Sequence, residues 1–445
     1  MADMQAGAAQ RVITPPLGAA MAGYFEPHHA EEVIANLHAR ALAVLDARGA
    51  SIAIVACDVL ALPADAVARI RDRVAEAAPI PPDRILVCAT HNHTGPQTAE
   101  IFGQPADAAY MDMLVQEAAD AVIEALANAA PAELVFGTAI EDRINTNRRV
   151  VMRDGSVHTH TTDADLNDEV GREGPADPEL GVLAVKDDQY SRALLVNYAL
   201  HPTNVRGDRI CPDYPGYLAE ILQPDLRGEA VTVFCNGACG NLDSKTPFLN
   251  DAPYGPGRAE RIACILADAV RRALETPAPL HGDTVCARSE TVRLPLKEVS
   301  PEQIAAARAV LAQDAPKELV FTRGTRRPSP LKERIYAAEA LRMAEMTAKQ
   351  PWVDAEIQLL AIGDLAVVGA PVELFTEFGL EIKRVARQRF PHVIVVELAN
   401  GYFGYVPTPE SFEGGGYETR LAVSSPLKPE AGDLIVQAAT RLLLA

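Results

Sequence analysis

Apolar runs of strand length alternate along the chain with alanine-rich stretches in which apolar residues recur at helical spacing. The runs at 51–59 and 84–89 are rich in valine, isoleucine and leucine, which is typical of buried strands. The stretch at 63–77 places its Arg and Asp residues on one helical face, as an amphipathic helix does. Further strands are expected at 133–139, 180–185, 193–199 and 230–235, and further helices at 110–129, 216–223 and 257–275. This alternation predicts an α/β fold in which a large mixed sheet is layered with helices.

One segment breaks the alternation, because it contains two helical stretches in succession. Ser300 and Gln303 flank Pro301 and Glu302 in the pattern of a capping box with proline at the first helical position. We therefore expect a helical hairpin at 298–352, inserted into a single domain that spans residues 1–445. No internal repeat is visible in the sequence.

The charge balance restricts the classes of partner. The 445 residues include 60 acidic and 41 basic ones, a formal net charge of −19. Nucleic acids and anionic membranes attract basic surfaces, so neither is expected as a partner. No run of about 18 apolar residues predicts a membrane span, and no signal peptide is recognised. The scattered cysteines fit buried, reduced thiols, so we expect a cytoplasmic protein, and the formation of homo-oligomers is left open.

Two histidines directly follow one of the apolar runs. Residues two apart in an extended chain point to the same side, so the rings of His91 and His93 are expected to face one space. That space lies at a strand end, where α/β proteins place ligands. A metal site fits this spacing, and so does a polar loop whose histidines hydrogen-bond the backbone.

Further polar residues follow other predicted strands. His201 follows the run at 193–199 and is the next candidate ligand. His158 and His160 form a second, weaker pair within a polar loop. Gly237 lies in a loop of small residues after the run at 230–235, where the backbone can approach a ligand closely. Three more residues are candidates for the same site. The alternative role is helix initiation for Glu373 and packing for Tyr405 and Tyr417.

These segments, taken together and in this order, resemble the catalytic domain of the neutral ceramidase family. The family consists of zinc amidases that hydrolyse the amide of N-acylsphingosine. The matching segments are 12–18, 21–24, 89–96, 200–201, 237–243, 371–373 and 405–417.

The resemblance implies a Zn²⁺ site and assigns roles around it. Histidine nitrogens together with carboxylate and phenol oxygens suit this ion. The implied zinc ligands are His91, His201, Glu373 and Tyr405. His93 would lie beside the metal, and Tyr417 would face the same site.

Two departures from the family pattern bear on the substrate. Asp243 occupies the position where ceramidases of this family have a serine, although a shift of one residue in the alignment would bring Ser244 there. The chain ends at Ala445 without the immunoglobulin-like domain that follows in true ceramidases. We therefore expect a short, intracellular, bacterial-type member that acts on a substrate other than ceramide.

The expected activity is hydrolysis of the amide bond of a small molecule by metal-activated water. Asp243 is the candidate general base, and His93 or Tyr417 would stabilise the oxyanion or protonate the leaving nitrogen. Asp58 is expected either to hold a ligand histidine in place or to be an ordinary turn residue. The alternatives are an esterase or lactonase with the same site and a metal-binding homologue without activity.

Arginine pairs well with carboxylates, so a segment with two arginines is a candidate binding site for an anionic part of the substrate. A structural role for the same arginines is the alternative. The expected substrate-binding residues are Asn147, Arg148, Arg149 and Gly237.

Overall fold

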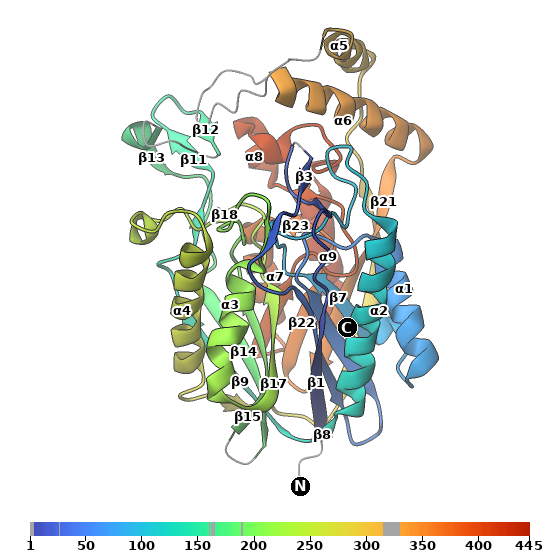
Figure 1. Ribbon diagram of the computed structural model, residues 1–445, viewed down its shortest axis with the longest axis vertical. Helices are drawn as coiled ribbons and strands as arrows, with labels where there is room; N and C mark the ends of the chain where they lie inside the picture. Colours follow the sequence, from blue (N-terminus) through green and yellow to red (C-terminus); the bar gives the residue numbers. More distant parts are fainter. Residues whose placement is uncertain (1–3, 26, 160, 162–164, 188–189, 315–329) are drawn as a thin grey trace.

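The computed structural model describes residues 4–445 except 26, 160, 162–164, 188–189 and 315–329. Its main strands form three sheets, and all three have the same topology. In each sheet the first three strands are antiparallel neighbours, and the fourth lies beside the third and parallel to it. A helix connects the third strand to the fourth, and a second helix follows the fourth (Figure 1).

The elements of the three units occur in chain order. The first unit consists of β1 (Gln5–Val12), β5 (His38–Leu45), β6 (Ser51–Cys57), α1 (Ala64–Ala77), β7 (Ile85–Ala89) and α2 (Ala108–Ala127), with β8 (Ala130–Pro131) added beside β1. The second consists of β9 (Glu133–Ile140), β14 (Glu179–Asp187), β15 (Tyr190–Tyr198), α3 (Asp213–Leu222), β17 (Leu226–Asn236) and α4 (Pro256–Ala273), with β19 (Ala278–Pro279) beside β9. The third consists of β20 (Val285–Pro295), β21 (Trp352–Ile362), β22 (Leu365–Gly369), α7 (Thr376–Ala386), β24 (His392–Val396) and α9 (Ala431–Leu444).

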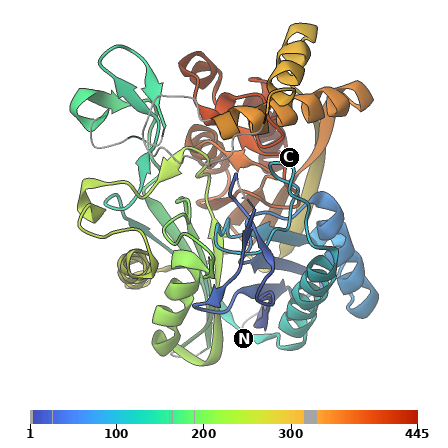
Figure 2. The same ribbon diagram turned by 45° about the horizontal axis from the view of Figure 1, so that its top comes forward.

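The three units surround one apolar core. Residues from all three sheets, among them Leu86, Val233 and Val367, are buried in the same central cluster. The outer faces are covered by the helices, since α2 packs on β1 and β5, α4 on β9 and β14, and α9 on β20 and β21. Figure 2 shows the first unit in blue, the second in green and the third in orange and red, in three sectors.

The predicted fold class is confirmed, and the structure adds what the sequence did not reveal. The strands are mixed and layered with helices as expected, but they are distributed over three separate main sheets. The repeated topology has no visible counterpart in the sequence, because topology requires only the alternation of apolar runs, and many different residues satisfy that alternation.

Two additions lie outside the repeated units. A small sheet of β11 (Val150–Met152), β12 (Val157–His158) and β13 (Glu169–Arg172) lies between β9 and β14 in the chain. Helices α5 (Pro301–Leu311) and α6 (Pro330–Lys349) lie between β20 and β21, and the capping box predicted at Ser300 is present. The part of the expected hairpin at 315–329 is outside the described residues, and the single-domain organisation stays a prediction.

Short pairings near the ends of the main strands complete the structure. They are β2 (Ala20–Met21) with β3 (His28–His29), β4 (Glu32–Val33) with β16 (Arg209–Ile210), β10 (Thr146–Asn147) with β18 (Leu242–Asp243), and β23 (Glu373–Leu374) with β25 (Tyr405–Val406). The short helix α8 (Pro409–Gly414) follows β25, and 3₁₀ turns lie at Pro82–Arg84, Asp165–Asp168, Gln223–Asp225, Pro247–Leu249 and Tyr417–Thr419. Within the described part of the chain, no helix combines the length and apolar character that crossing a membrane requires.

Candidate metal centre

The candidate ligands lie just beyond the carboxyl ends of the parallel strand pairs. His91 follows β7 of the first unit, His201 follows β15 of the second, and Glu373 follows β22 of the third. Loops that leave the carboxyl ends of parallel strands are the usual ligand-binding region of α/β proteins. Each unit therefore contributes one residue to a common point.

Three histidines meet at this point with their Nε2 atoms. The Nε2 atoms of His91 and His201 are 2.9 Å apart, and those of His91 and His93 are 3.3 Å apart. In the described residues these three side chains form a group whose ligand atoms lie within 4.8 Å of one another. His91 and His201 are each 1% exposed, and His93 is partly exposed.

Backbone carbonyl groups fix the orientation of the two buried rings through their Nδ1 atoms. His91 Nδ1 lies 2.9 Å from the carbonyl oxygen of Leu60, and His201 Nδ1 lies 2.9 Å from that of Cys239. A carbonyl oxygen only accepts, so Nδ1 carries the hydrogen in both rings. When both rings are neutral, they direct two Nε2 lone pairs at each other, an arrangement that a cation between them stabilises.

The backbone at His91 supports the same interpretation. Its φ angle is +69°, in the left-handed region that residues other than glycine seldom adopt. Such strain persists where the surroundings hold a residue in place, and it is common at ligand sites.

The carboxylate of Glu373 completes the centre. Its Oε2 lies 3.3 Å from His91 Nε2 and 3.7 Å from His201 Nε2, and it is buried without a hydrogen-bond partner. Burial raises the pKa of Glu373, but His91 and the hydroxyl groups of Tyr405 and Tyr402 outweigh this effect and lower it. Burial lowers the pKa of His91, but the Glu373 carboxylate outweighs it and the pKa is raised.

Two predicted tyrosines lie on the third-unit side of the centre. The pairing of β23 with β25 places Tyr405 opposite Glu373. The hydroxyl groups of Tyr405 and Tyr417 are 2.9 Å apart, and Arg148 Nη2 donates to the Tyr417 hydroxyl. Burial raises the pKa of Tyr417, so its hydroxyl keeps its proton at neutral pH.

Asp243 lies on β18, directly opposite Thr146 of β10. Its Oδ1 accepts the backbone N–H of Lys245 at 2.9 Å. Burial raises the pKa of Asp243, and the positive charges of Arg148, Arg172 and Lys245 oppose the shift.

The neighbouring Ser244 is buried inside the protein. It is 1% exposed, its hydroxyl donates to Asn204 Oδ1 at 2.7 Å, and Arg258 Nη2 lies 3.2 Å from the same hydroxyl. A shifted alignment that brings Ser244 to the site therefore finds no support in its contacts.

The expected substrate-binding arginines are already paired. Arg148 Nε donates to Glu418 at 2.9 Å and its Nη2 to the carbonyl oxygen of Gly240 at 2.7 Å. Arg149 is fully buried, and its guanidinium contacts Glu173 and Glu418. The surroundings of both residues match the structural alternative, and direct contact of Arg149 with a substrate has no support in this geometry.

Asn147 and Gly237 also have structural partners. Asn147 Nδ2 donates to the carbonyl oxygen of Pro175 at 3.1 Å, and its Oδ1 accepts the backbone N–H of Arg149. A Cβ on Gly237 would lie 3.0 to 3.1 Å from Ala199, so Gly237 packs closely against the residue that follows β15. Their contact with a substrate stays a prediction.

Several residues that shape the centre were not recognised in the sequence. Tyr402 donates from its hydroxyl to Glu373 Oε1 at 2.9 Å. Glu397 accepts hydrogen bonds from the backbone N–H groups of Cys239 and Leu374, each at 3.1 Å, and thereby joins the Cys239 loop to β23. The sequence offered one signal for Tyr402: it lies after a predicted apolar run in the same glycine-containing loop as Tyr405.

Asp58 and His158 lie outside the centre. Asp58 pairs with Arg40 at 2.7 Å and accepts the backbone N–H of His38, so it braces the strand end and does not contact a ligand histidine. His158 lies on β12 of the small sheet, and His160 is outside the described residues.

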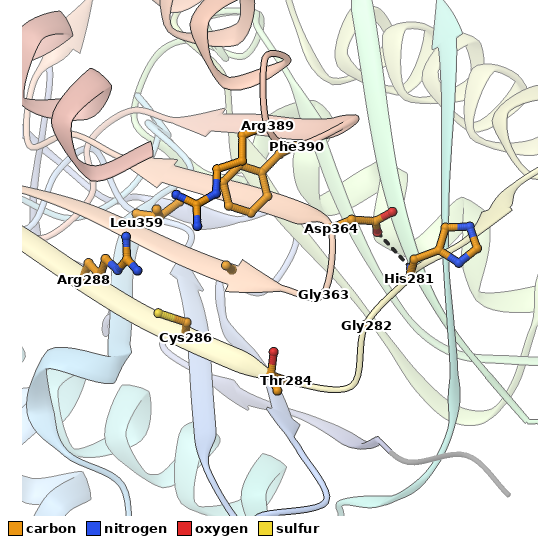
Figure 3. Close-up of a pocket in the computed structure, with 11 residues that line it drawn as sticks. His281, Gly282, Thr284, Cys286, Arg288, Leu359, Gly363, Asp364, Arg389 and Phe390 are labelled. Atoms are coloured by element: carbon orange, nitrogen blue, oxygen red, sulfur yellow. Dashed lines mark hydrogen bonds between the residues drawn. The ribbon is translucent and has the colours of Figure 1, made fainter. Parts of the chain in front are cut away.

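A surface hollow of about 330 Å³ lies at the opposite end of the third sheet (Figure 3). It is lined by residues at the amino ends of β20, β22 and β24, among them Cys286, Arg288 and Arg389. Both arginines are exposed and reach carbonyl oxygens at the end of α9. We assign this hollow no role in the chemistry.

The chain is similar in sequence to the neutral ceramidase of Pseudomonas aeruginosa, with 24% identity over 386 residues that cover 76% of this chain and 56% of that protein. The chain thus spans little more than half the length of this relative. No protein-family model matches the chain.

Solved structures show the same fold. The crystal structure of neutral ceramidase from P. aeruginosa superposes with a TM-score of 0.75 at 19% identity, covering 100% of this chain and 75% of the other. A structure of ceramidase complexed with C2 gives a TM-score of 0.74 at 19% identity, covering 99% and 75%. The chain is therefore similar to neutral ceramidase in sequence, and it shares the fold of the solved ceramidase structures.

Proposed function

We propose that this chain is a zinc-dependent hydrolase that cleaves an amide bond. The observation that carries the proposal is the buried Glu373 Oε2, which lacks a hydrogen-bond partner and faces two histidine Nε2 atoms within 3.7 Å. A buried carboxylate oxygen and converging imidazole nitrogens are costly unless they share a cation. The similarity to neutral ceramidase, an amide hydrolase, supports the reaction class.

The residues fit a zinc ion in number and chemistry. Imidazole nitrogen and carboxylate oxygen are ligands that zinc accepts, and a catalytic site keeps a position open. We assign His91, His201 and Glu373 as ligands, with Tyr405 as the fourth, because the pairing of β23 with β25 places it opposite Glu373. The ion held there would polarise the amide carbonyl and lower the pKa of a water molecule.

The chain's own residues would move the protons. Asp243 is the proposed base, because burial raises the pKa of its carboxyl group and so favours proton acceptance near neutral pH. His93 and Tyr417 would hydrogen-bond the oxyanion or the leaving nitrogen. Burial and the charges of His91 and Arg148 lower the pKa of His93, so its imidazole is neutral and acts as a hydrogen-bonding group.

The substrate that we propose is a small-molecule amide other than ceramide. The support is Asp243, which occupies the position of the serine in the family pattern, together with the buried state of Ser244. Cytoplasmic location and self-association stay predictions.

Zinc content and hydrolysis measured on the same preparation test the proposal. The purified chain is expected to contain about one zinc ion and to hydrolyse members of a panel of N-acyl amides faster than the matching esters. His91→Ala is expected to lose both metal and activity, whereas His281→Ala, at the opposite strand ends, keeps both. Retention of metal by His91→Ala, or turnover of esters alone, contradicts the assignment.

A further inference from the structure

The loop that follows His201 carries an exposed arginine at the edge of the candidate centre. Arg206 lies five residues after His201, and it is exposed. The next residue, Gly207, donates its backbone N–H to the Tyr24 hydroxyl at 3.0 Å. The Tyr24 segment in turn touches the centre, because a Cβ on Gly23 would lie 2.7 Å from His93 Nδ1. Arg206 is thus anchored between two segments that border the histidines.

The guanidinium of Arg206 is held by an aromatic ring. It stacks over Tyr254, with its carbon 3.6 Å from the ring centroid. Its Nε hydrogen bond to the carbonyl oxygen of Thr203 is long, at 3.4 Å. Stacking of this kind restrains the plane of the guanidinium and leaves its edge of N–H donors free for a ligand.

Arg206 has no carboxylate partner among the described residues, although the chain has 60 acidic residues against 41 basic ones. The two nearest acidic residues in the sequence are engaged elsewhere. Asp208 contacts His28 at 2.6 Å. Asp213 accepts backbone N–H groups from Asn204 and Val205, both at 2.8 Å.

A second arginine increases the positive charge at the same place. Arg258 lies over the same Tyr254 ring at 4.7 Å. It donates to the carbonyl oxygens of Leu249 and Ala252, at 2.6 and 2.7 Å, and no described carboxylate forms an ion pair with it. One tyrosine ring is therefore contacted by two guanidinium groups, in a protein whose net charge is −19.

We propose that Arg206, with its plane set by Tyr254, binds a carboxylate group carried by the amide substrate. A planar guanidinium offers two parallel N–H donors that match a carboxylate. The inference rests on the proposed amide hydrolysis and specifies its substrate class, the N-acyl amino acids and related carboxylated amides. Arg206 would be a specificity-determining residue, because its loop borders the histidines without supplying a ligand.

The test compares two ligands that differ in one charge, N-octanoylglycine and the neutral N-octanoylglycinamide. Loss of a charge-assisted hydrogen-bonded pair corresponds to about a 10- to 100-fold change. Arg206→Gln is therefore expected to lower kcat/KM for N-octanoylglycine by that factor more than for N-octanoylglycinamide, mainly through KM. Arg206→Lys is expected to recover part of the loss.

Binding to the metal-free protein provides a second readout that needs no turnover. Isothermal titration calorimetry is expected to show tighter binding of N-octanoylglycine than of its amide, and Arg206→Gln is expected to remove the difference. Arg293→Gln is the matched control, because Arg293 is also exposed and stacks on an aromatic ring, Trp352, but lies on the edge strand β20.

The outcomes separate this inference from the proposed function. Equal binding of the two ligands by the unaltered protein, or an equal preference in Arg206→Gln, overturns the role of Arg206. A preference for the carboxylate that depends on Arg206, without hydrolysis of either ligand, supports the binding site and overturns the amidase instead.

Discussion

The carboxyl ends of the three parallel strand pairs differ sharply in their chemistry from the amino ends of the pair in the third sheet. At the carboxyl ends of the parallel pairs, buried polar groups such as His91, His201 and Glu373 converge. At the amino ends of β22 and β24, the hollow of Figure 3 is open and its arginines, Arg288 and Arg389, reach helix-end carbonyl oxygens. The difference shows that the fold places loops at one end where polar groups can be buried together.

The comparison also explains why no single unit could form the centre. The proposed histidine ligands come from the first and second units, whereas Glu373 and Tyr405 come from the third. The ligands come together because the three sheets pack on one core. We therefore expect substitutions at the carboxyl ends to affect metal and turnover, and substitutions at the amino ends to affect stability alone.

The largest effect is expected from Glu373→Gln. This change removes the negative charge that faces His91 and His201 and keeps the size of the side chain. Activity is expected to fall by about 10³-fold or more, with loss of bound zinc, because a ligand and part of the electrostatic stabilisation are lost together. Metal analysis and initial rates check the prediction. A Glu373→Gln protein that keeps full zinc content is incompatible with the proposed ligand set.

The next effect is expected from Asp243→Asn, which removes a proton acceptor and leaves the proposed ligands intact. The rate of hydrolysis is expected to fall by about 10²- to 10⁴-fold, the usual contribution of a general base. Zinc content is expected to remain unchanged. Ser244→Ala is the neighbouring control, with an expected loss of stability from its contacts with Asn204 and Arg258. An unchanged rate in Asp243→Asn assigns the base to another group.

The candidate ligands show how much of the site the sequence alone could predict. The strand ends before His91 and His201 were predicted correctly, because each follows a buried apolar run that is visible by composition. Their convergence depends on how three sheets pack, and no local pattern encodes that. The roles of the candidate ligands could therefore be inferred from the resemblance to a family. The distances between their atoms could be obtained only from the structure.

Other features could not be derived because they depend on tertiary contacts. The pairing of Arg148 and Arg149 with Glu418 joins residues about 270 positions apart. Tyr402 is distinguished from other tyrosines only by its contact with Glu373. The strands β1 and β5 were not expected either, because alanine and glycine dilute the apolar alternation in β1 and alanine does so in β5.

A smaller effect is expected from Tyr402→Phe, which deletes one hydroxyl group beside the centre. The hydrogen bond to Glu373 Oε1 fixes the carboxylate so that Oε2 faces the histidines. Groups that orient a metal ligand are worth about 10- to 100-fold in metal affinity. Competition with a chelator is expected to show weakened zinc binding with little change in the unfolding temperature. Equal zinc affinity of Tyr402→Phe and the unaltered protein would show that Tyr402 contributes packing alone.

Metal binding is also expected to depend on pH. The Glu373 carboxylate raises the pKa of His91 against the opposing effect of burial, so a proton competes with the metal for His91. Zinc affinity is therefore expected to fall about tenfold per pH unit below that raised pKa, and to level off above it. Calorimetry in buffers of different ionisation enthalpy is expected to show proton release on binding. In metal-free Glu373→Gln, titration of His91 followed by NMR is expected to show a lower pKa than in the metal-free unaltered protein, because His91 loses the carboxylate that raises its pKa.

The smallest effects are expected at the opposite strand ends. Arg288→Gln and Arg389→Gln remove exposed side chains that reach the carbonyl oxygens of Leu442 and Leu443 at 3.5 and 3.3 Å. Cations near the end of a helix contribute about 0.3 to 1 kcal/mol, so each variant is expected to lose stability on that scale. Activity and zinc content are expected to stay within about twofold, since neither arginine contacts a strand end that carries a ligand. Chemical denaturation and initial rates measured side by side check both parts. A large loss of activity with an unchanged unfolding free energy would make the hollow part of the functional machinery and remove the distinction between the two ends.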